Sequence, residues 1–505
     1  MNLVEPEELP MIRSADEPDL VGTLLLWLAY GKRHHAGGLD PVDPVYDCGN
    51  LHFYEREQGI WSPITRTEVS AEMQAWHGLE YGDPDDPRVL KISRQKIENV
   101  YRLACDRADR TGTDNRPGFF ADARPGIAFA DCFVGLDRSG TDLSVEDLAP
   151  ELRARRRLEW SLSDAMAAYE SDFNDSRFSG FLTEVFEGEE DAGAKVGLLQ
   201  EFLGGALIGV STRFQRALVV FGNGSNGKSV LLKVVQSLFP RGLVSSVPPQ
   251  DFSSNFKKAA LEGKTLNVVN ELPEQDFLAT QDFKALIDGN DYTGSHKFGQ
   301  EHTIKARAAH VFSANLLPRV RDLSHGFWRR WLVVPFNRVF EPGERDPHLV
   351  QRIRSEEEAL VATWLILGAE RLLERGEYAV PAACQRALEE WRREANPVAT
   401  FVQVCCTTVR STCEKPTPTA VLSVAFNEFA RETGHRPLSD AVFGRRLSQL
   451  GYESRQSRWG TNRPRCVDLW LKPEWQHAWH HPYVKRVVGT IPTSMSSASS
   501  AISDP

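Results

Sequence analysis

Two kinds of hydrophobic pattern alternate along the chain. Between about residues 213 and 340, apolar residues come in short, nearly continuous runs that are rich in β-forming side chains. Runs of this kind, with helical segments between several of them, indicate buried strands of an α/β sheet. The runs occupy residues 217–221, 265–269, 308–314 and 331–336.

Outside this region, apolar positions recur mainly at helical spacing. Residues 85–110 and 158–207 show it, and residues 355–376 predict an amphipathic helix pair that ends at a glycine. A charged helix over residues 385–395 lies between two prolines and is predicted to be a connector. Residues 398–472 mix helical and strand patterns, which predicts a small αβ unit.

The two ends of the chain add less. Residues 51–64 form two alternating runs around Gln58-Gly59, which predicts a β-hairpin. Residues 83–88 predict a proline-rich loop, and His34-His35 predict a solvated loop rather than metal ligands. The first 200 residues show no catalytic constellation. The serine-rich end, residues 488–505, is poor in bulky apolar side chains and predicts disorder.

Composition limits the number of domains, the extent of any nucleic-acid surface and the cellular compartment that we expect. A chain of 505 residues is too long for one compact core, so roughly two to four domains are expected. The balance of 59 basic and 69 acidic residues gives a net charge of −10, which confines any nucleic-acid surface to a pore or a small module. None of the eight cysteines forms a Cys-x-x-Cys pair, and neither a signal peptide nor a spanning apolar run is evident. We expect a cytoplasmic protein with no membrane partner.

The strongest chemical signal is a glycine-rich loop of the form G-x-x-x-x-G-K-S. It follows an apolar run and precedes a helical pattern over residues 230–239, the context that a phosphate-binding P-loop requires. Glycines let backbone N–H groups face the phosphates, with a helix N-terminus behind them. Lys228 is expected to reach the β- and γ-phosphates of ATP, and Ser229 to ligate Mg²⁺. The loop consists of Gly222, Asn223, Gly224, Ser225, Asn226, Gly227, Lys228 and Ser229.

Later positions complete a hydrolytic site. Glu271 ends one apolar run, where a carboxylate can polarise the attacking water and hold the hydrated metal; because Asn270 precedes it, Glu271 carries both tasks. Asn315 ends the next run and is predicted to position that water against the γ-phosphate. Arg329 or Arg330 is a candidate arginine finger for a neighbouring subunit's nucleotide, although an adjacent pair is also typical of a solvated turn.

In this order, the motifs resemble the superfamily 3 helicase core of phage and plasmid primase-helicases, including the poxvirus-type proteins. The resemblance implies an AAA+-like ATPase that works as a hexamer, with ATP and Mg²⁺ bound between subunits. It also implies 3′-to-5′ translocation on one DNA strand. The matching residues are 222–229, 261–272, 283–291, 310–318 and 326–336.

The resemblance assigns further residues in the core. Lys284 occupies the basic position that in relatives faces the adjacent subunit's phosphates. Residues 292–300 fall where relatives carry a hairpin that grips DNA in the central pore, which makes Lys297 and Phe298 the expected contacts with a single strand. Ser295 stands where relatives usually have an arginine, and a hairpin without DNA contact stays an alternative.

The resemblance is weaker outside the core. Residues 120–205 look like the helical domain that precedes the motor, although Cys132-Phe133 departs from the relatives' Asn-Gly. The C-terminal unit resembles a winged helix that binds duplex DNA through phosphate contacts. A protein-docking or purely solvated role for its arginines stays open. These are Arg445 and Arg446 on the recognition helix, and Arg455, Arg458, Arg463 and Arg465 in the wing.

Together these assignments predict a multidomain α/β protein. About 200 residues precede the motor and contain no pair of strand-borne aspartates for catalytic metals, so priming is assigned to a separate polypeptide or is absent. The expected parts are 1–120 (α+β), 121–205 (helical pre-motor), 206–345 (AAA+-like P-loop core), 346–397 (helical lid or connector), 398–482 (winged helix) and 483–505 (disordered).

The leading interpretation is an ATP-dependent DNA helicase, a hexameric ring that replicates a phage, prophage or plasmid. The alternative is a DNA-binding initiator or regulator whose ATPase switches assembly and displaces no strand. A small-molecule kinase fits less well, because Arg329-Arg330 follows Asn315 and no acceptor-substrate lid is evident.

Overall fold

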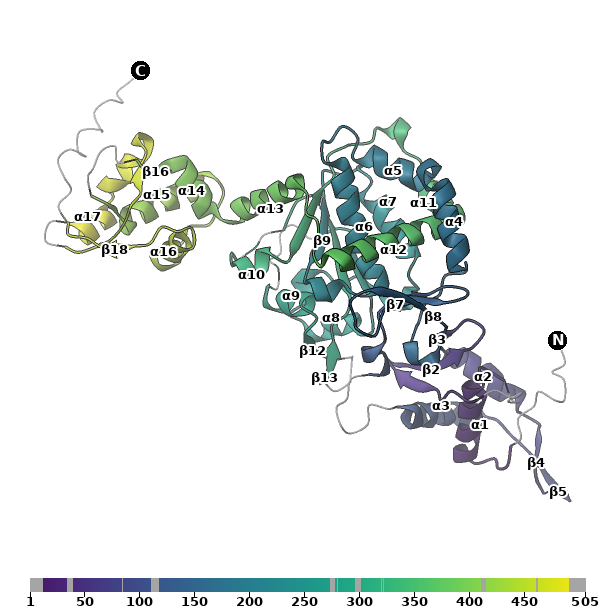
Figure 1. Cartoon of the computed structure of the whole chain (residues 1–505). Coiled ribbons are helices and arrows are strands. Elements are labelled where there is room, and N and C mark those ends of the chain that lie inside the picture. Colours follow the sequence, from purple (N-terminus) through teal and green to yellow (C-terminus); the bar gives the residue numbers. More distant parts are fainter. Residues whose placement is uncertain are drawn as a thin grey trace. The chain divides into compact units, whose positions relative to one another are not determined.

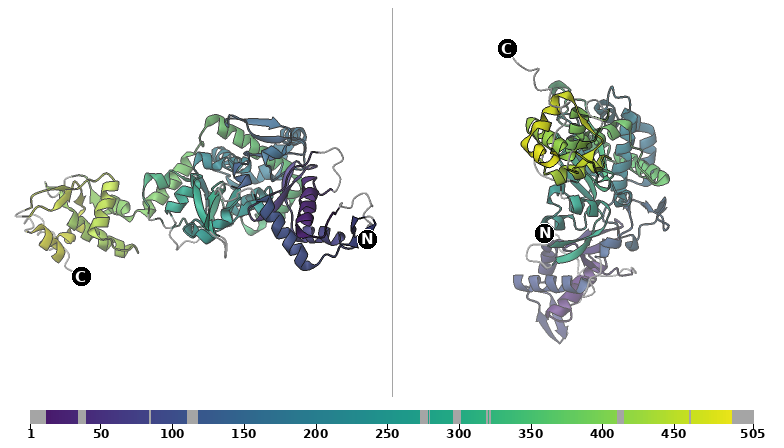
Figure 2. Two further views of the ribbon diagram at one scale, coloured as in Figure 1. Left: turned by 90° about the horizontal axis from the view of Figure 1, so that it is seen from below. Right: turned by 90° about the vertical axis from the view of Figure 1, so that its left-hand side faces the viewer.

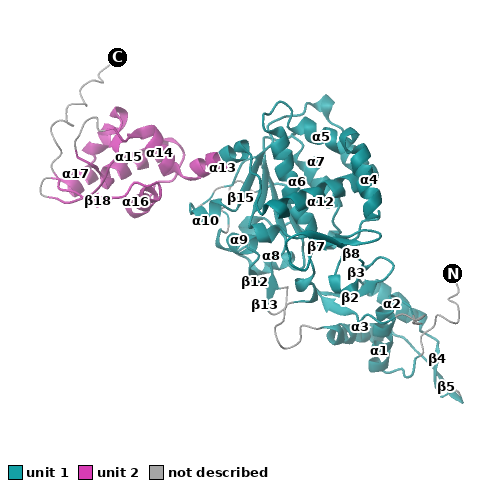
Figure 3. Cartoon of the chain, in the orientation of Figure 1, with its two compact units in different colours: residues 1–387 teal, residues 388–505 magenta. Residues whose placement is uncertain are grey.

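The computed structural model places the chain in two compact units, residues 1–387 and residues 388–505 (Figure 3). The finer six-part division stays a prediction. No helix within the described residues combines the length and the apolar character that a bilayer crossing requires. The structure describes residues 12–33, 40–83, 85–109, 118–272, 278, 280–295, 301–318, 320, 322–409, 415–459 and 462–489.

A five-stranded parallel sheet forms the centre of the first unit (Figure 1). Nearly every residue of its four longest strands is buried, which explains why their sequences are continuously apolar rather than alternating. The predicted α/β core is therefore confirmed as a parallel sheet. The strands lie in the spatial order β10 (Val244–Ser245), β11 (Leu266–Val269), β14 (Ala309–Ala314), β9 (Ala217–Phe221) and β15 (Trp331–Pro335).

Helices α6 (Ala192–Ile208) and α12 (Glu358–Arg375) pack against each other through glycines. Gly204 faces the carbonyl of Leu365, and Gly368 faces the carbonyl of Gln200, so a Cβ at either glycine would collide with backbone. The prediction of a helix pair over residues 355–376 is wrong, because a single helix, α12 (Glu358–Arg375), covers nearly all of this stretch. The helices that accompany the parallel sheet in this unit include α4 (Leu162–Asp172), α5 (Arg177–Val185), α6 (Ala192–Ile208), α7 (Lys228–Ser237), α11 (Leu349–Glu356) and α12 (Glu358–Arg375).

The helical predictions around this core are confirmed in part. Residues 158–207 form three helices, and α12 ends at Gly376, whose φ of 77° suits glycine. The first part of the predicted helical domain 121–205 is wrong, because it forms an antiparallel sheet of short apolar runs separated by turns. Its strands are β6 (Gly126–Ala128), β7 (Phe133–Leu136) and β8 (Leu143–Glu146).

The N-terminal part has a hydrophobic core of its own. The hairpin predicted over residues 51–64 is confirmed, since Glu55 of one strand pairs with Ile60 of the next. The predicted loop 83–88 is wrong, because it belongs to a second hairpin, and the helix predicted from residue 85 begins only after its Ser93 cap. The elements are α1 (Glu17–Ala29), β1 (Val45–Asp47), β2 (Asn50–Glu55), β3 (Ile60–Pro63), α2 (Arg66–Ala75), β4 (Glu80–Asp83), β5 (Asp86–Val89) and α3 (Arg94–Ala108).

The hairpin predicted over residues 292–300 is also confirmed, as β12 (Asp291–Ser295) paired antiparallel with β13 (Glu301–Lys305). Lys297 and Phe298 fall in the sequence between these strands and lie outside the described residues, so their contact with DNA stays a prediction. Three short helices belong to the same part of the unit: α8 (Asn255–Lys258), α9 (Thr280–Ile287) and α10 (His325–Trp328).

The base of this hairpin is fastened to an earlier segment of the chain. The guanidinium of Arg307, two residues past β13, donates to the carbonyl oxygens of Ala121 and Ala123, the latter at 2.8 Å. Lys305, the last residue of β13, lies 3.7 Å from the carboxylate of Asp122. The hairpin is therefore anchored to the segment that joins the N-terminal part to the sheet-containing core.

The second unit is a small αβ structure, as residues 398–472 predicted (Figure 2). The predicted tail is wrong at its start, because residues 482–488 form a helix whose Val484 and Val488 are fully buried. The connector helix is confirmed as α13 (Ala382–Ala395). The other elements are α14 (Pro397–Cys405), β16 (Cys406–Thr407), β17 (Thr417–Pro418), α15 (Thr419–Glu432), α16 (Asp440–Gln449), β18 (Arg455–Gln456), β19 (Arg465–Val467), β20 (Trp470–Leu471) and α17 (Pro482–Val488).

Candidate functional site

The glycine-rich loop joins β9 to α7, so the predicted strand–loop–helix arrangement is confirmed. Gly224 and Gly227 have φ values of 92° and 86°, which other residues rarely adopt. A Cβ on Gly227 would also lie only 2.7 Å from the side chain of Val185 in α5. These glycines are needed both for the curl of the loop and for the close approach of α5.

Lys228 opens α7 and is buried in the curl of the loop. Its Nζ donates to the carbonyl oxygen of Gly222 at 2.5 Å, to Asn226 Oδ1 at 2.9 Å and to Asn315 Oδ1 at 3.3 Å. Burial lowers the pKa of Lys228, while the nearby Glu271 carboxylate acts in the opposite direction. The ammonium is thus held at a fixed place by neutral oxygens rather than by an ion pair.

The two predicted strand-end residues lie beside this lysine. Glu271 follows β11 and Asn315 follows the neighbouring β14, because the carboxyl ends of parallel strands meet at one edge of the sheet. Asn315 Nδ2 donates to Glu271 Oε1 at 3.4 Å. Lys228, Asn315 and Glu271 therefore form a continuous polar series, assembled from three parts of the sequence.

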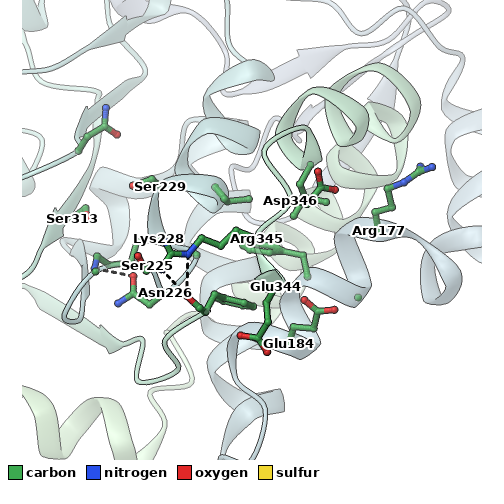
Figure 4. A pocket seen from close by; sticks show the side chains of 18 of the residues that line it. Arg177, Glu184, Ser225, Asn226, Lys228, Ser229, Ser313, Glu344, Arg345 and Asp346 are labelled. Atoms are coloured by element: carbon green, nitrogen blue, oxygen red, sulfur yellow. Dashed lines mark hydrogen bonds between the residues drawn. The ribbon is translucent and has the colours of Figure 1, made fainter. Parts of the chain in front are cut away.

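These residues line a cavity of about 700 Å³. Figure 4 shows Ser313 and Glu184 on opposite sides of Lys228. One side is formed by the strand ends that the sequence predicted, and the other by α5 and the segment 340–352, which no motif indicated. This second side is lined by Arg177, Gly180, Phe181, Glu184, Phe340, Glu344, Arg345, Asp346, Leu349 and Arg352.

The segment after β15 is hydrogen-bonded to the glycine-rich loop. Asn226 Nδ2 donates to the carbonyl oxygen of Phe336 at 3.1 Å, and the Phe340 N–H donates to the carbonyl oxygen of Ser225 at 2.8 Å. The Arg345 guanidinium donates to the Phe340 carbonyl oxygen at 3.0 and 2.8 Å. The second side of the cavity is therefore positioned by the loop itself.

The ligand set for a metal in this cavity is small. Within the described ranges, no group of three or more histidine, cysteine, aspartate or glutamate side chains is arranged to hold a metal ion. Mg²⁺ at nucleotide sites takes most of its ligands from phosphate and water, and one or two from protein. The Ser229 hydroxyl and the Glu271 carboxylate both line the cavity, so the residues present fit that pattern.

Arg329 and Arg330, which the sequence left equivalent, differ in the structure. Arg330 is buried and binds Asp288 with two hydrogen bonds of 2.8 and 2.5 Å. Arg329 is exposed, and within the described ranges its guanidinium donates to the neutral side-chain oxygen of Gln215 alone, at 3.1 and 3.2 Å. Neither arginine lines the cavity of its own chain.

Lys284, the other cation assigned by resemblance, also lies away from this cavity. Its ammonium pairs with the carboxylate of Asp322 and donates to Ser324 Oγ at 3.1 Å. The same contact holds the pKa of Asp322 below its usual value, although burial of that carboxyl acts in the opposite direction. The three residues predicted to act on a neighbouring subunit's nucleotide therefore do not line the cavity around Lys228 within one chain. They are Lys284, Arg329 and Arg330.

The predicted arginines of the second unit lie on α16 and on the β18–β19 hairpin. Arg445 and Arg458 are exposed, and Arg455 is exposed but pairs with Asp468 at 2.9 Å. Arg446 is half-buried, and burial lowers its pKa. The winged-helix assignment and DNA binding by these arginines both stay predictions.

Comparisons with known proteins give two findings. Residues 220–330 match the family of unknown function DUF5906. An apo structure of the C-terminal region of NrS-1 is 16% identical to this chain, covering 58% of this chain and 75% of its own, with a TM-score of 0.37. Two further apo structures of that region are 12% identical and cover 88% of this chain and 99% or 98% of their own, with TM-scores of 0.41 and 0.39. These values assign neither a family nor a fold to the whole chain.

Proposed function

We propose that this chain is a P-loop ATPase whose hydrolysis drives work on DNA. One observation carries the proposal: the buried ammonium of Lys228 lies in a glycine-rich loop, next to the amide of Asn315 and the carboxylate of Glu271. The chemistry of phosphoryl transfer needs a fixed cation, a metal ligand and a group that orients water. These three groups meet at the edge of one parallel sheet.

In the proposed mechanism, the loop N–H groups and Lys228 bind the phosphates of ATP and neutralise charge that develops on them. Ser229 and Glu271 would hold Mg²⁺, which supplies further neutralisation when bound. Glu271 orients the attacking water and takes its proton, and Asn315 holds that water in line with the γ-phosphate. The existing hydrogen bond between Asn315 and Glu271 keeps both groups in position beforehand.

We assign the trans-acting role in a hexameric ring to Arg329 rather than Arg330. Withdrawing Arg330 from Asp288 would leave a partly buried carboxylate without its cation, which is costly. Among the described residues, the Arg329 guanidinium would have to leave just the neutral oxygen of Gln215, so it can reach a neighbouring nucleotide at little cost. Lys284 is intermediate, because its pair with Asp322 is partly exposed.

The work that hydrolysis drives is proposed to be 3′-to-5′ unwinding during replication. The β12–β13 hairpin would hold a single strand, and the arginines of the second unit would hold the duplex by phosphate contacts. An initiator or regulator that uses the same ATPase only to control assembly remains the second candidate. The exposed arginines of the second unit are compatible with both functions.

The test combines ATP hydrolysis with strand displacement on a forked DNA. The expected result is hydrolysis that single-stranded DNA stimulates, together with displacement, and loss of both in Lys228→Ala. Lys233→Ala is the matched control, because Lys233 is an exposed lysine on the same helix. Stimulated hydrolysis without displacement would favour the assembly switch, and a wild-type protein that hydrolyses no nucleotide would refute the proposal.

A further inference from the structure

The side of the cavity formed by α5 and residues 340–352 has a composition of its own. Phe181, Phe340 and Leu349 give it apolar walls, and the cavity of about 700 Å³ is within the range of sites that enclose a whole small ligand. Phe181 packs against the loop at Gly227, and the Phe340 N–H bonds to Ser225, so both rings adjoin the phosphate-binding loop. A ligand held by that loop would extend between them.

Most carboxylates that line this cavity already have partners in the chain. Glu344 pairs with Arg338, Asp346 pairs with Arg352, and Glu271 accepts from Asn315. The Glu184 carboxylate is different: among the described residues, neither a hydrogen-bond donor nor a cation contacts it. Its acceptor oxygens are therefore available to a ligand.

Glu184 is exposed and lies at the C-terminal end of its helix. Glu184 lies in the last turn of α5, where the helix dipole favours cations and disfavours carboxylates. The last turn of α5 contains no basic residue. Arg338 donates to the carbonyl oxygen of Glu184 at 2.9 Å and so satisfies this helix end, but its guanidinium pairs with the carboxylates of Glu187 and Glu344 rather than with that of Glu184. The Glu184 carboxylate thus lines the cavity without an ion pair among the described residues.

We propose that this side of the cavity is a nucleoside subsite and that Glu184 determines its specificity. The apolar walls enclose the base, and Glu184 accepts a hydrogen bond from a neutral donor of the nucleoside, either a sugar hydroxyl or an exocyclic amino group. This inference rests on the proposed ATPase function, because the loop must hold the phosphates. It adds that the α5 side, which carries no recognisable motif, selects the nucleotide.

The experiment measures dissociation constants of the full-length chain for four ligands: ATP, dATP, purine riboside triphosphate and inorganic tripolyphosphate. dATP lacks the 2′-hydroxyl, and purine riboside triphosphate lacks the amino group, whereas tripolyphosphate lacks the whole nucleoside. The variants are Glu184→Ala and Glu184→Gln. Glu187→Gln is the matched control, because Glu187 is exposed, pairs with Arg338 and does not line the cavity.

Glu184→Ala is expected to weaken ATP binding about tenfold or more, the usual scale for a hydrogen bond to a charged group, and to leave tripolyphosphate binding unchanged. It should also abolish the wild-type preference for ATP over dATP if the donor is the sugar, or over purine riboside triphosphate if it is the amino group. Unchanged ATP binding by Glu184→Ala would overturn the subsite while leaving the ATPase intact. Failure of the wild type to bind either ATP or tripolyphosphate would refute the proposed function itself.

Discussion

Positive charge is buried in the cavity of the first unit and mostly exposed on the arginine surface of the second unit, which consists of Arg445, Arg446, Arg455 and Arg458. Lys228 is buried and fixed by three oxygen atoms, at a cost in desolvation that lowers its pKa. Arg445 and Arg458 lie on an exposed surface, where water and salt screen their charges. A fixed, desolvated charge suits chemistry at one atom, whereas an exposed group of charges suits a long, uniform polyanion.

This difference has a practical meaning for mutations. In a site where no group duplicates the task of another, removing a single side chain should remove most of the activity. On a surface where several equivalent cations share a task, each removal should take away a similar, salt-dependent fraction of the affinity. The following predictions test whether the two regions obey these different rules.

The largest effect is expected for Glu271→Gln in the cavity. The amide keeps the size of the side chain but cannot take a proton from water, so hydrolysis should fall by about 10²–10⁴-fold. ATP binding should persist, because Lys228 and the loop are untouched. Single-turnover hydrolysis and nucleotide binding on the same preparation measure both quantities, and near-normal turnover would exclude Glu271 as the base.

The next effect separates the two adjacent arginines. Arg330→Ala should reduce the free energy of unfolding by about 3–5 kcal/mol, because it leaves the carboxylate of Asp288 without its cation. Arg329→Ala should change it by less than about 1 kcal/mol, since the side chain is exposed. Urea unfolding of both variants measures the difference.

The same pair tests the assignment of the trans-acting role. Arg329→Ala subunits and Glu271→Gln subunits should each hydrolyse little ATP alone but regain part of the activity when mixed, because an intact Glu271 of one subunit then meets an intact Arg329 of the next. A mixture that stays as inactive as its two components would show that Arg329 does not act across the interface.

A smaller, graded effect is expected on the arginine surface. Arg445→Ala and Arg458→Ala should each weaken duplex DNA binding by a few-fold and reduce the slope of log affinity against log salt by about 1. Arg431→Ala is the matched control, because Arg431 is exposed on α15 and lies outside α16 and the β18–β19 hairpin. Loss of all binding from one substitution would break the contrast between the two regions.

The smallest effect concerns pH. Because burial lowers the pKa of Lys228 below the usual 10.5, its ammonium loses the proton at a lower pH than an exposed lysine does. ATP affinity should therefore begin to fall on the alkaline side before pH 10.5, whereas the arginines keep their charge. Titrations of ATP binding at constant ionic strength test this, and Lys228→Arg should remove the pH dependence of whatever binding it retains.

Much of the candidate site could be predicted from sequence because its residues share one local pattern. Lys228 lies in a complete motif, and Glu271 and Asn315 each end an apolar run. A parallel sheet brings the ends of its strands together whatever the spacing in the chain, so a local pattern was sufficient to group them. The same reasoning predicted the buried strands.

The rest depended on contacts between distant segments that no local pattern encodes. Glu184 and Phe340 occupy the cavity only because α5 and the segment after β15 pack beside the loop. Arg329 and Arg330 became distinguishable only when Asp288 was found beside one of them. The sheet around β7 was missed because short strands within a helix-rich region give weak periodicity.

The anchoring of Arg307 decides where this polypeptide can be divided. A fragment that began at residue 206 would lack the carbonyl groups of Ala121 and Ala123, and with them the attachment of the β12–β13 ribbon. It would also lose most of α6, and so uncover the face of α12 around Gly368. A fragment that keeps the sheet-containing core intact therefore starts upstream of residue 121, and the segment around Ala121 is part of that core's structure rather than a detachable accessory.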